Sequence, residues 1–246
     1  MEPIFRHNFE ISDLHLDCHG RVKPSVLLFF AQEAAGQHCQ LLKLDWETLA
    51  KQNLFWAVTR HRVQITRLPV RGETITVETW PMPTTKVAYP RSVVGYDAQG
   101  NELFRTISLW VLMDSQSRSM VLPGKSGVVV DGVLRGNELA LPHSILPGER
   151  PNQQLQTVRY SHLDRNGHMN NTRYMDWVND LLPSAYHGEH PIREFTICYH
   201  AEAREGQEIT MDWDLTEDPC LVVDAHRAKT DVPDKQERVF SAKVEF

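Results

Sequence analysis

Long apolar runs and targeting signals are absent from this sequence of 246 residues. No run of 18 or more apolar residues occurs, so a membrane-spanning helix is not expected. The N-terminal stretch MEPIFRHNFE lacks the charged and apolar regions of a signal peptide. We therefore expect a soluble, cytoplasmic protein that inserts into no membrane.

Cysteine and basic charge are also scarce. The four cysteines, Cys18, Cys39, Cys198 and Cys220, are far apart and form no CxxC pair, so we expect buried thiols rather than a zinc site or disulfides. The formal net charge of −6 argues against a nucleic-acid partner, because neutralising phosphates requires clustered Lys and Arg. No G-x-S-x-G motif is present, which argues against a serine triad of the α/β-hydrolase type. The sequence indicates no metal and no cofactor.

The sequence predicts one order of elements twice. In the first half, residues 25–43 have the apolar spacing of a helix with one buried face and follow Pro24, a favourable helix start. The next segments are rich in β-branched and aromatic residues and predict antiparallel strands: WAVTRHRVQI, ETITVETW, VAYPRSVVGYD and LFRTISLWVLMD.

The second half begins after residues 141–156, which hold prolines and polar residues without periodicity and predict a linker. The segment NTRYMDWVNDLL then predicts a helix that begins near Asn170 and Asn171, both good N-cap residues. The strands predicted after it are REFTICYHAEA, EITMDWDL, CLVVDAHRA and RVFSAKVEF. We expect an α+β fold with domains at 1–140 and 157–246, in which each antiparallel sheet buries one face against a helix.

The two halves can be aligned by pairing His15 with His162, an offset of 162 − 15 = 147. HLDCHGRVKP then lies over HLDRNGHMNN, and His, Leu, Asp and Gly match. The order of elements supports this weak identity and suggests two fused copies. Only the second copy has Asn166 and His168, because His19 and Arg21 occupy the matching positions.

The segment HLDRNGHMNN contains groups that could hydrolyse an activated acyl bond. His168 could exchange a proton near neutral pH, and Asp164 could orient it, activate water or attack a carbonyl itself. Asn166 could hold the attacking water or donate to an oxyanion. Unpaired N–H groups at the helix start, near Asn170 and Asn171, could stabilise a developing oxyanion. An isolated histidine before a helix is more often a surface or capping residue, but the surrounding polar groups favour a catalytic role.

The pattern D-R-N-G-H-M-N-N-T-R-Y, the later Y-H-A-E-A and the first-half segments FWAVTRHRVQI and GETITVETWP closely resemble the acyl-acyl-carrier-protein (acyl-ACP) thioesterases of plants and bacteria. The resemblance spans nearly the whole chain. It implies a tandem hotdog fold, with each sheet wrapped around one long helix and the halves packed as an internal pseudo-dimer. It also implies hydrolysis of the thioester that joins a fatty acyl chain to the phosphopantetheine arm of ACP. Whether two chains associate as a homodimer stays open.

The resemblance also assigns site residues. Asp164, Asn166 and His168 match the family's catalytic positions, and its downstream glutamate falls on Glu202. An offset of 206 − 72 = 134 pairs Glu202 with Leu68, so this carboxylate too occurs in the second half alone; a solvated strand-end glutamate is the alternative. Many plant members have a cysteine where this chain has Ala203. We therefore favour attack by water assisted by Glu202 or Asp164, with an acyl-Asp164 intermediate as the alternative.

Two further sets of residues are candidates for binding. The first half would supply the acyl pocket, lined by Leu27, Phe30 and Ala34, although the small residues of AQEAAG could equally permit close packing of helix and sheet. ACP is acidic, so the basic residues that flank the two helix starts are candidates for docking, with solvated surface charge as the alternative for each. They are Arg21, Lys23, Arg165 and Arg173.

Two other functions stay open. An acyl-CoA thioesterase on the same scaffold would act on a different carrier. A non-catalytic acyl-binding protein would hold lipid in both halves, but the polar groups retained at Asp164, Asn166, His168 and Glu202 argue against it.

Overall fold

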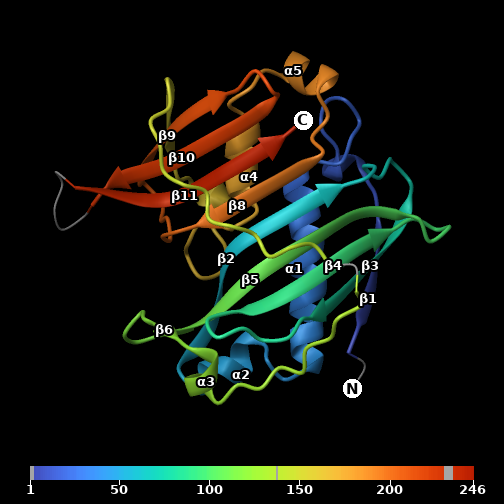
Figure 1. The fold of residues 1–246 in the computed structure, drawn as a ribbon, viewed down its shortest axis with the longest axis vertical. Helices are drawn as coiled ribbons and strands as arrows, with labels where there is room; N and C mark the ends of the chain where they lie inside the picture. The colour runs from blue at the N-terminus through green and yellow to red at the C-terminus, as the bar shows by residue number, and fades with distance from the viewer. Residues whose placement is uncertain (1–2, 137, 230–234) are drawn as a thin grey trace. The chain divides into compact units, whose positions relative to one another are not determined.

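The computed structural model describes residues 3–136, 138–229 and 235–246. The chain divides into two compact units, unit 1 from Met1 to Pro142 and unit 2 from His143 to Phe246. Figure 1 shows strands and helices in both. The predicted α+β class is confirmed.

Unit 1 contains an antiparallel sheet in the order β1-β3-β4-β5-β2, with the short β6 paired to β5. Its strands are β1 (Phe5–Glu10), β2 (Leu54–Ile65), β3 (Thr74–Pro81), β4 (Tyr89–Tyr96), β5 (Glu102–Asp114) and β6 (Met120–Val121). Its helices are the 3-10 turn η1 (Asp13–His15), α1 (Pro24–Leu41), α2 (Trp46–Ala50) and α3 (Pro123–Ser126).

Helix α1 confirms the helix predicted from the apolar spacing. It begins with Pro24 at the first turn, where a missing backbone N–H removes no helical hydrogen bond. The buried face of α1 packs against β1 and β3. Figure 1 shows α1 crossing one face of the unit 1 sheet.

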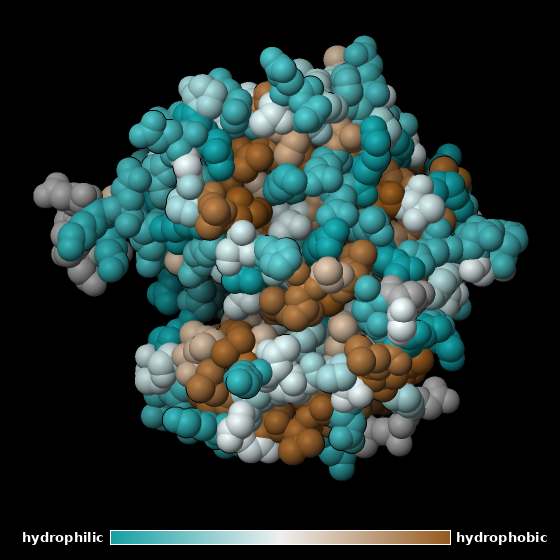
Figure 2. Space-filling model, viewed as in Figure 1, coloured by the Kyte–Doolittle hydropathy of each residue, from teal (hydrophilic) through white to brown (hydrophobic). Residues whose placement is uncertain are grey.

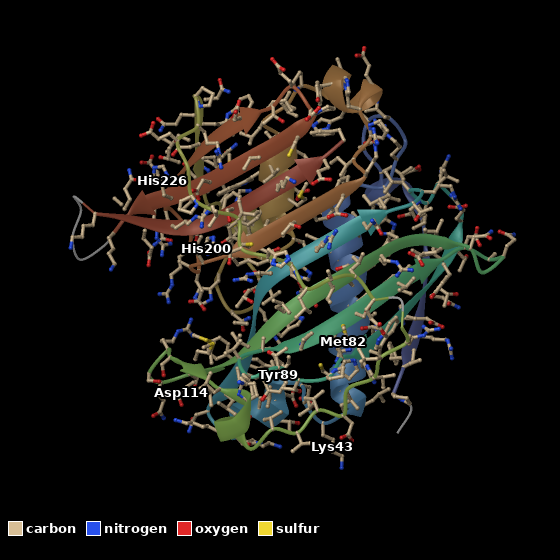
Figure 3. The ribbon with its side chains drawn as sticks, viewed as in Figure 1. Lys43, Met82, Tyr89, Asp114, His200 and His226 are labelled. Atoms are coloured by element: carbon tan, nitrogen blue, oxygen red, sulfur yellow. The ribbon has the colours of Figure 1, made fainter. Side chains whose placement is uncertain are left out.

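Side chains fix the connections of unit 1. Asp114, labelled in Figure 3, accepts hydrogen bonds from the backbone N–H groups of Gln116 and Ser117 and so closes the turn after β5. Tyr89, also labelled there, shares a hydrogen bond of 2.8 Å with the hydroxyl of Ser126 and ties α3 to β4.

Unit 2 contains an antiparallel sheet in the order β7-β9-β10-β11-β8. Its strands are β7 (Asn152–Thr157), β8 (Glu194–Tyr199), β9 (Glu208–Leu215), β10 (Cys220–Ala228) and β11 (Gln236–Glu245). Its helices are the 3-10 turn η2 (Tyr160–His162), α4 (Arg173–Asn179) and α5 (Ser184–Glu189). Taken strand by strand, this is the order found in unit 1.

The strand predictions are confirmed for β2 to β5 and β8 to β11, but the linker prediction was wrong at its C-terminal end. Residues 152–156 belong to β7, which pairs with β9. The sequence NQQLQT contains a single apolar residue, Leu155, and the strand is held mainly by backbone hydrogen bonds to one neighbour. Its apolar periodicity was therefore too weak to detect.

The helix of unit 2 is shorter than predicted. α4 begins at Arg173 rather than near Asn170 and ends at Asn179. Pro183 follows four residues later and precedes the separate helix α5, because a proline inside a helix would remove a backbone hydrogen bond. The expectation of one long helix in each half is therefore correct for unit 1 and wrong for unit 2. Tyr174 of α4 packs against Phe240 of β11, at 4.9 Å between ring centroids.

The surface is predominantly hydrophilic on the face shown in Figure 2, with brown side chains in separate patches among teal ones. Exposed apolar residues of this kind are common in folded proteins. In the part of the chain that the structure describes, no helix has the length and apolar character needed to cross a membrane.

Candidate functional site

The segment Leu163–Met169 forms a tight hairpin closed by a β-bridge between its end residues. The backbone N–H of Asp164 donates to the carbonyl of His168 at 2.8 Å, and Gly167 turns the chain with a φ of +73°. Glycine suits this position because a side chain strains the left-handed backbone. The hairpin places Asp164 and His168 directly across from each other.

The Asp164 carboxylate is held by Asn166. The backbone N–H of Asn166 donates to Oδ1 of Asp164 at 2.7 Å, and its side-chain Nδ2 lies 3.4 Å from Oδ2. The first of these is a strong contact to a charged acceptor, whereas the second is long. The carboxylate of Asp164 is thus fixed within the hairpin, beside an exposed amide.

The imidazole of His168 meets the carboxylate of Glu202, which lies 34 residues later (202 − 168). Nε2 of His168 is 3.3 Å from Oε2 of Glu202, and their side chains are 18% and 40% exposed. Both groups are therefore accessible to a small molecule. The structure brings together all four residues predicted to be catalytic, as an Asp164–Asn166 pair and a His168–Glu202 pair joined through one hairpin.

Backbone hydrogen bonds join this hairpin to the segment that carries Glu202. The N–H of Met169 donates to the carbonyl of Ala203 at 2.8 Å. The hydroxyl of Tyr174 is hydrogen-bonded to the backbone of Ala203, and burial raises the pKa of this phenol, so it stays protonated. The hydroxyl of Tyr199 donates to the carbonyl of Asn171 at 2.9 Å.

The corresponding segment of unit 1 has the same backbone arrangement at the offset of 147. The N–H of Asp17 donates to the carbonyl of Arg21 at 2.7 Å, a bridge joins Leu16 to Val22, and Gly20 has a φ of +72°. The preceding His15 ring contacts Phe30 at 5.3 Å and 81°, and His162 contacts Trp177 at the same distance and angle.

The side chains differ at the positions that matter for chemistry. Arg21 occupies the place of His168 in unit 1, and its Nε lies 3.8 Å from Asp17. Leu68 takes the place of Glu202 in the alignment of the turn glycines. The hairpin is therefore a shared structural element, whereas the imidazole–carboxylate pair is specific to unit 2.

The structure gives Asn170 and Asn171 contacts within the protein. Both were predicted to bind substrate at the start of the helix. Oδ1 of Asn170 accepts hydrogen bonds from the backbone N–H and the hydroxyl of Thr172, both at 2.9 Å. Asn170 therefore stabilises a turn that precedes the helix, and Thr172 is the N-cap residue of α4. The prediction that Asn170 or Asn171 caps α4 directly was wrong.

The residues predicted to line an acyl pocket lie in the interior of unit 1. Leu27, Phe30 and Ala34 each have 0% of their surface exposed. The Phe30 ring packs against Phe9 at 4.5 Å between centroids. In this structure the three side chains are closely packed, so an alkyl chain would reach them only after neighbouring side chains move.

The predicted docking residues have varied surroundings. Arg173 is exposed and pairs with Asp176 at 3.2 Å, Arg165 is exposed, and Arg21 and Lys23 are half-buried. Arg173 also lines an open groove of about 560 Å³ in unit 2. The other lining residues are Leu155, Gln156, Thr157, Arg159, Ser161, His162, Asp176, Trp177 and Asp180.

Sequence reasoning missed Arg159, which adds a second guanidinium to this groove, as well as the residues that support Glu202. Burial and the nearby Arg173 and Arg159 lower the pKa of His162, also in the groove, so it is neutral at pH 7. Within residues 3–136, 138–229 and 235–246, no group of three or more His, Cys, Asp or Glu side chains is arranged to hold a metal ion.

Comparison with known proteins gives matches along both units. Residues 2–122 match the acyl-ACP thioesterase N-terminal domain, and residues 147–241 match the acyl-ACP thioesterase C-terminal domain. The palmitoyl-acyl carrier protein thioesterase of Gossypium hirsutum is 25% identical over 214 residues, covering 81% of this chain and 52% of that protein. The dodecanoyl-[acyl-carrier-protein] hydrolase of Cinnamomum camphora is 26% identical over 216 residues, covering 81% and 56%. The chain thus spans about half the length of the curated relatives it matches.

Solved structures share the fold. An acyl-ACP thioesterase from Bacteroides thetaiotaomicron superposes with a TM-score of 0.84 at 24% identity, covering 99% of this chain and 98% of that one. The 12:0-ACP thioesterase from Umbellularia californica gives a TM-score of 0.82 at 23% identity, with 100% and 97% covered. These likenesses establish an α+β, hotdog-like fold. Since the two domain matches together cover most of the sequence, the chain belongs to the acyl-ACP thioesterase family.

Proposed function

We propose that this protein hydrolyses the thioester of fatty acyl-ACP and releases a free fatty acid. The observation that carries the proposal is the 3.3 Å contact between His168 and Glu202 beside the Asp164–Asn166 pair. These groups occur in unit 2, and unit 1 has Arg21 and Leu68 at the positions that match the imidazole and the carboxylate. The family relationship supports the same substrate class.

In the proposed reaction, water attacks the thioester carbonyl carbon. Glu202 or Asp164 accepts the proton of this water, and Asn166 holds the water in place. When the C–S bond breaks, protonated His168 gives its proton to the departing thiolate. The products are the fatty acid and the free thiol of the carrier. The proton taken from water returns to His168 across the His168–Glu202 contact if Glu202 was the base, or through solvent if Asp164 was the base, and the starting state is restored.

The alternative route begins with attack by the Asp164 carboxylate on the thioester carbonyl carbon, which breaks the C–S bond and forms an acyl-Asp164 anhydride while His168 gives a proton to the departing thiolate. Water then cleaves the anhydride, which releases the fatty acid and restores the Asp164 carboxylate. The contact with Asn166 at 2.7 Å favours the water route, because a carboxylate held by a backbone N–H is a weaker nucleophile. Mass spectrometry of rapidly quenched enzyme during turnover distinguishes the two routes. The water route predicts no acyl adduct on the peptide containing Asp164.

We further propose that the chain is a tandem of two hotdog units, with unit 1 binding the acyl chain and unit 2, which includes β7, carrying the catalytic groups. The matching strand order and the matching hairpins support this division. Leu27, Phe30 and Ala34 would contact the alkyl chain after their packing opens. Each buried CH₂ would add about 0.8 kcal/mol, so the depth of the opened space would set the preferred chain length.

The decisive experiment measures hydrolysis of acyl-ACP across chain lengths by wild type and by Asp164→Asn, His168→Ala and Glu202→Gln. Loss of a general acid or base lowers the rate by about 10²- to 10⁴-fold, so kcat should fall by that factor in the His168 and Glu202 variants. A His168→Ala variant with the wild-type rate would remove His168 from the mechanism, whereas a wild-type rate no higher than that of the uncatalysed reaction would favour an acyl-binding protein without catalysis.

The same assay with acyl-CoA tests the carrier. The proposal expects a higher kcat/KM with acyl-ACP than with acyl-CoA of equal chain length. Faster hydrolysis of long-chain acyl-CoA would contradict the ACP assignment while leaving thioester hydrolysis in place.

A further inference from the structure

Arg227 of β10 makes contacts that converge on the backbone of Glu202. Its Nη1 donates to the carbonyl of Glu202 at 2.7 Å. Its Nε and Nη2 donate to one oxygen of Glu237 at 3.0 and 2.7 Å. Because a guanidinium is planar and holds its donors at fixed angles, the pairing with Glu237 sets the direction of Nη1.

The Glu202–Ala203 segment is therefore held at successive backbone groups. The carbonyl of Glu202 accepts from Arg227, the backbone of Ala203 is hydrogen-bonded to the Tyr174 hydroxyl, and the carbonyl of Ala203 accepts from the N–H of Met169. Met169 directly follows His168. These contacts fix the distance between the chain segments that carry the two groups of the His168–Glu202 pair.

A strand-end ion cluster also exists in unit 1, but its cation comes from a different position. The offset of 134 pairs Thr76 of β3 with Thr210 of β9. Thr76 lies opposite Tyr96 of β4, and Thr210 lies opposite His226 of β10. The residues that follow Tyr96 and His226, Asp97 and Arg227, therefore occupy matching positions. In unit 1 the cation is Arg67, which binds Glu73 and Asp97 at 2.9 and 3.6 Å.

In unit 2 the matching positions are Ala201, Gln207 and Arg227. The cation of unit 2 is therefore Arg227, at the position that matches Asp97 rather than Arg67, and from this position it reaches the carbonyl of Glu202. Two other positions near the site also differ between the units. Unit 2 has Glu202 where unit 1 has Leu68, at the offset of 134, and Tyr174 where unit 1 has Leu27, at the offset of 147. If the cluster only closed the end of the sheet, the unit 1 arrangement would serve.

We propose that Arg227 is a positioning residue, which holds the backbone of Glu202 and so keeps the Glu202 carboxylate against the imidazole of His168. This inference rests on the hydrolytic role proposed for that pair. Arg227 acts through the backbone of Glu202 and does not itself contact the reacting thioester. Its removal should lower kcat and leave substrate binding nearly unchanged.

The test compares Arg227→Met with Arg238→Met. Arg238 of β11 is a matched control, since it is also part-buried, pairs with the carboxylate of Asp224 and donates to a backbone carbonyl, that of Ile145 at 2.9 Å. Misplacement of a catalytic group by about 1 Å costs up to about 100-fold in rate. We expect Arg227→Met to lower kcat by about 10- to 100-fold with KM within about twofold, and Arg238→Met to retain the wild-type kcat.

Two further measurements separate positioning from general stability. In the double variant Glu202→Gln/Arg227→Met, kcat should equal that of Glu202→Gln alone, because Arg227 acts through Glu202. Arg227→Lys, which keeps the positive charge on a single nitrogen without the planar fork, should fold and have an intermediate kcat. Wild-type kcat in Arg227→Met, or a full additional loss in the double variant, would overturn the proposal.

Amide hydrogen exchange tests the backbone contacts without any substrate. The amides of Met169 and Ala203 should exchange faster in Arg227→Met and at the wild-type rate in Arg238→Met. Unchanged exchange in Arg227→Met would refute the positioning role. If wild type fails to hydrolyse acyl-ACP, the proposed function fails, whereas the exchange result still decides whether Arg227 holds this segment.

Discussion

At the scale of single residues, two histidines show how burial decides what an imidazole can do. His61 of β2 is 3% exposed, and burial lowers its pKa to about 4. His168 keeps 18% of its side chain exposed and has the Glu202 carboxylate beside it. An imidazole that must exchange protons with a substrate needs such access, so His61 is a structural residue and His168 is the candidate acid–base group.

The lowered pKa of His61 predicts a pH-dependent stability. Between pH 6.5 and about 4 the unfolded chain binds a proton that the folded chain does not, so the free energy of unfolding falls as the pH falls. A shift of this size corresponds to about 3 kcal/mol. Urea unfolding at pH 7, 5.5 and 4.5 should show a weaker pH dependence in His61→Leu than in wild type.

The exposed His19 provides the control for this experiment. His19→Gln should retain the full pH dependence of the wild type. Equal pH dependence in His61→Leu and in wild type would show that other groups cause the loss of stability in acid.

At the scale of secondary structure elements, the hairpin of residues 163–169 determines where the catalytic side chains point. Gly167 has a φ of +73° and nothing within 4 Å of an added Cβ, so an alanine there would meet strain but no clash. Gly20 has the same properties in the hairpin of unit 1. The two glycines therefore form a matched pair, one beside His168 and one beside Arg21.

Gly167→Ala and Gly20→Ala should each lower the free energy of unfolding by about 1–2 kcal/mol, because an L-residue is strained at this φ. Only Gly167→Ala should also reduce kcat, since strain relief in that hairpin moves His168. Urea titration and steady-state kinetics on both variants measure these effects. An equal loss of kcat in Gly20→Ala would show that the activity depends on overall stability instead.

The elements that sequence reasoning could predict are those with a strong apolar pattern. The inner strands β3 and β9 and the helix α1 have this pattern, and all were predicted. The strands β1 and β7 were missed. Each is six residues long, pairs with one neighbour in its unit and is largely polar, so that backbone hydrogen bonds rather than apolar burial stabilise it.

The part of the candidate site that lies in one short stretch of sequence could be predicted. Asp164, Asn166 and His168 lie within five residues, so their grouping is visible in the sequence. Glu202 required the family resemblance and the offset between the halves. Arg227 could not be found, because its contact with Glu202 depends on the register of β10 against β11, which residue types do not specify.

At the scale of the whole molecule, net charge bears on the proposed carrier. The chain has a formal net charge of −6, which opposes association with an acidic protein at long range. Docking of ACP would then depend on local basic groups such as Arg159 and Arg173 at the groove of unit 2. Salt weakens such contacts between exposed charges.

Acyl-ACP should therefore show a KM that rises as the salt concentration is raised from about 50 to 200 mM, while an uncharged acyl thioester shows little change. Arg173→Gln should raise KM for acyl-ACP at low salt and leave kcat near the wild-type value. Lys51→Gln, which removes an exposed charge in unit 1, is the control and should change neither. Equal KM values for wild type and Arg173→Gln would remove this arginine from the docking surface.

The hairpin of unit 1 retains the backbone of its counterpart without the reactive side chains. Its turn, bridge and 3-10 entry are already formed, so His19→Asn, Arg21→His and Leu68→Glu would introduce an amide, an imidazole and a carboxylate with little rebuilding of the main chain. A second reaction centre engineered in unit 1 would also need a guanidinium at Asp97 and a phenol at Leu27, the positions that match Arg227 and Tyr174.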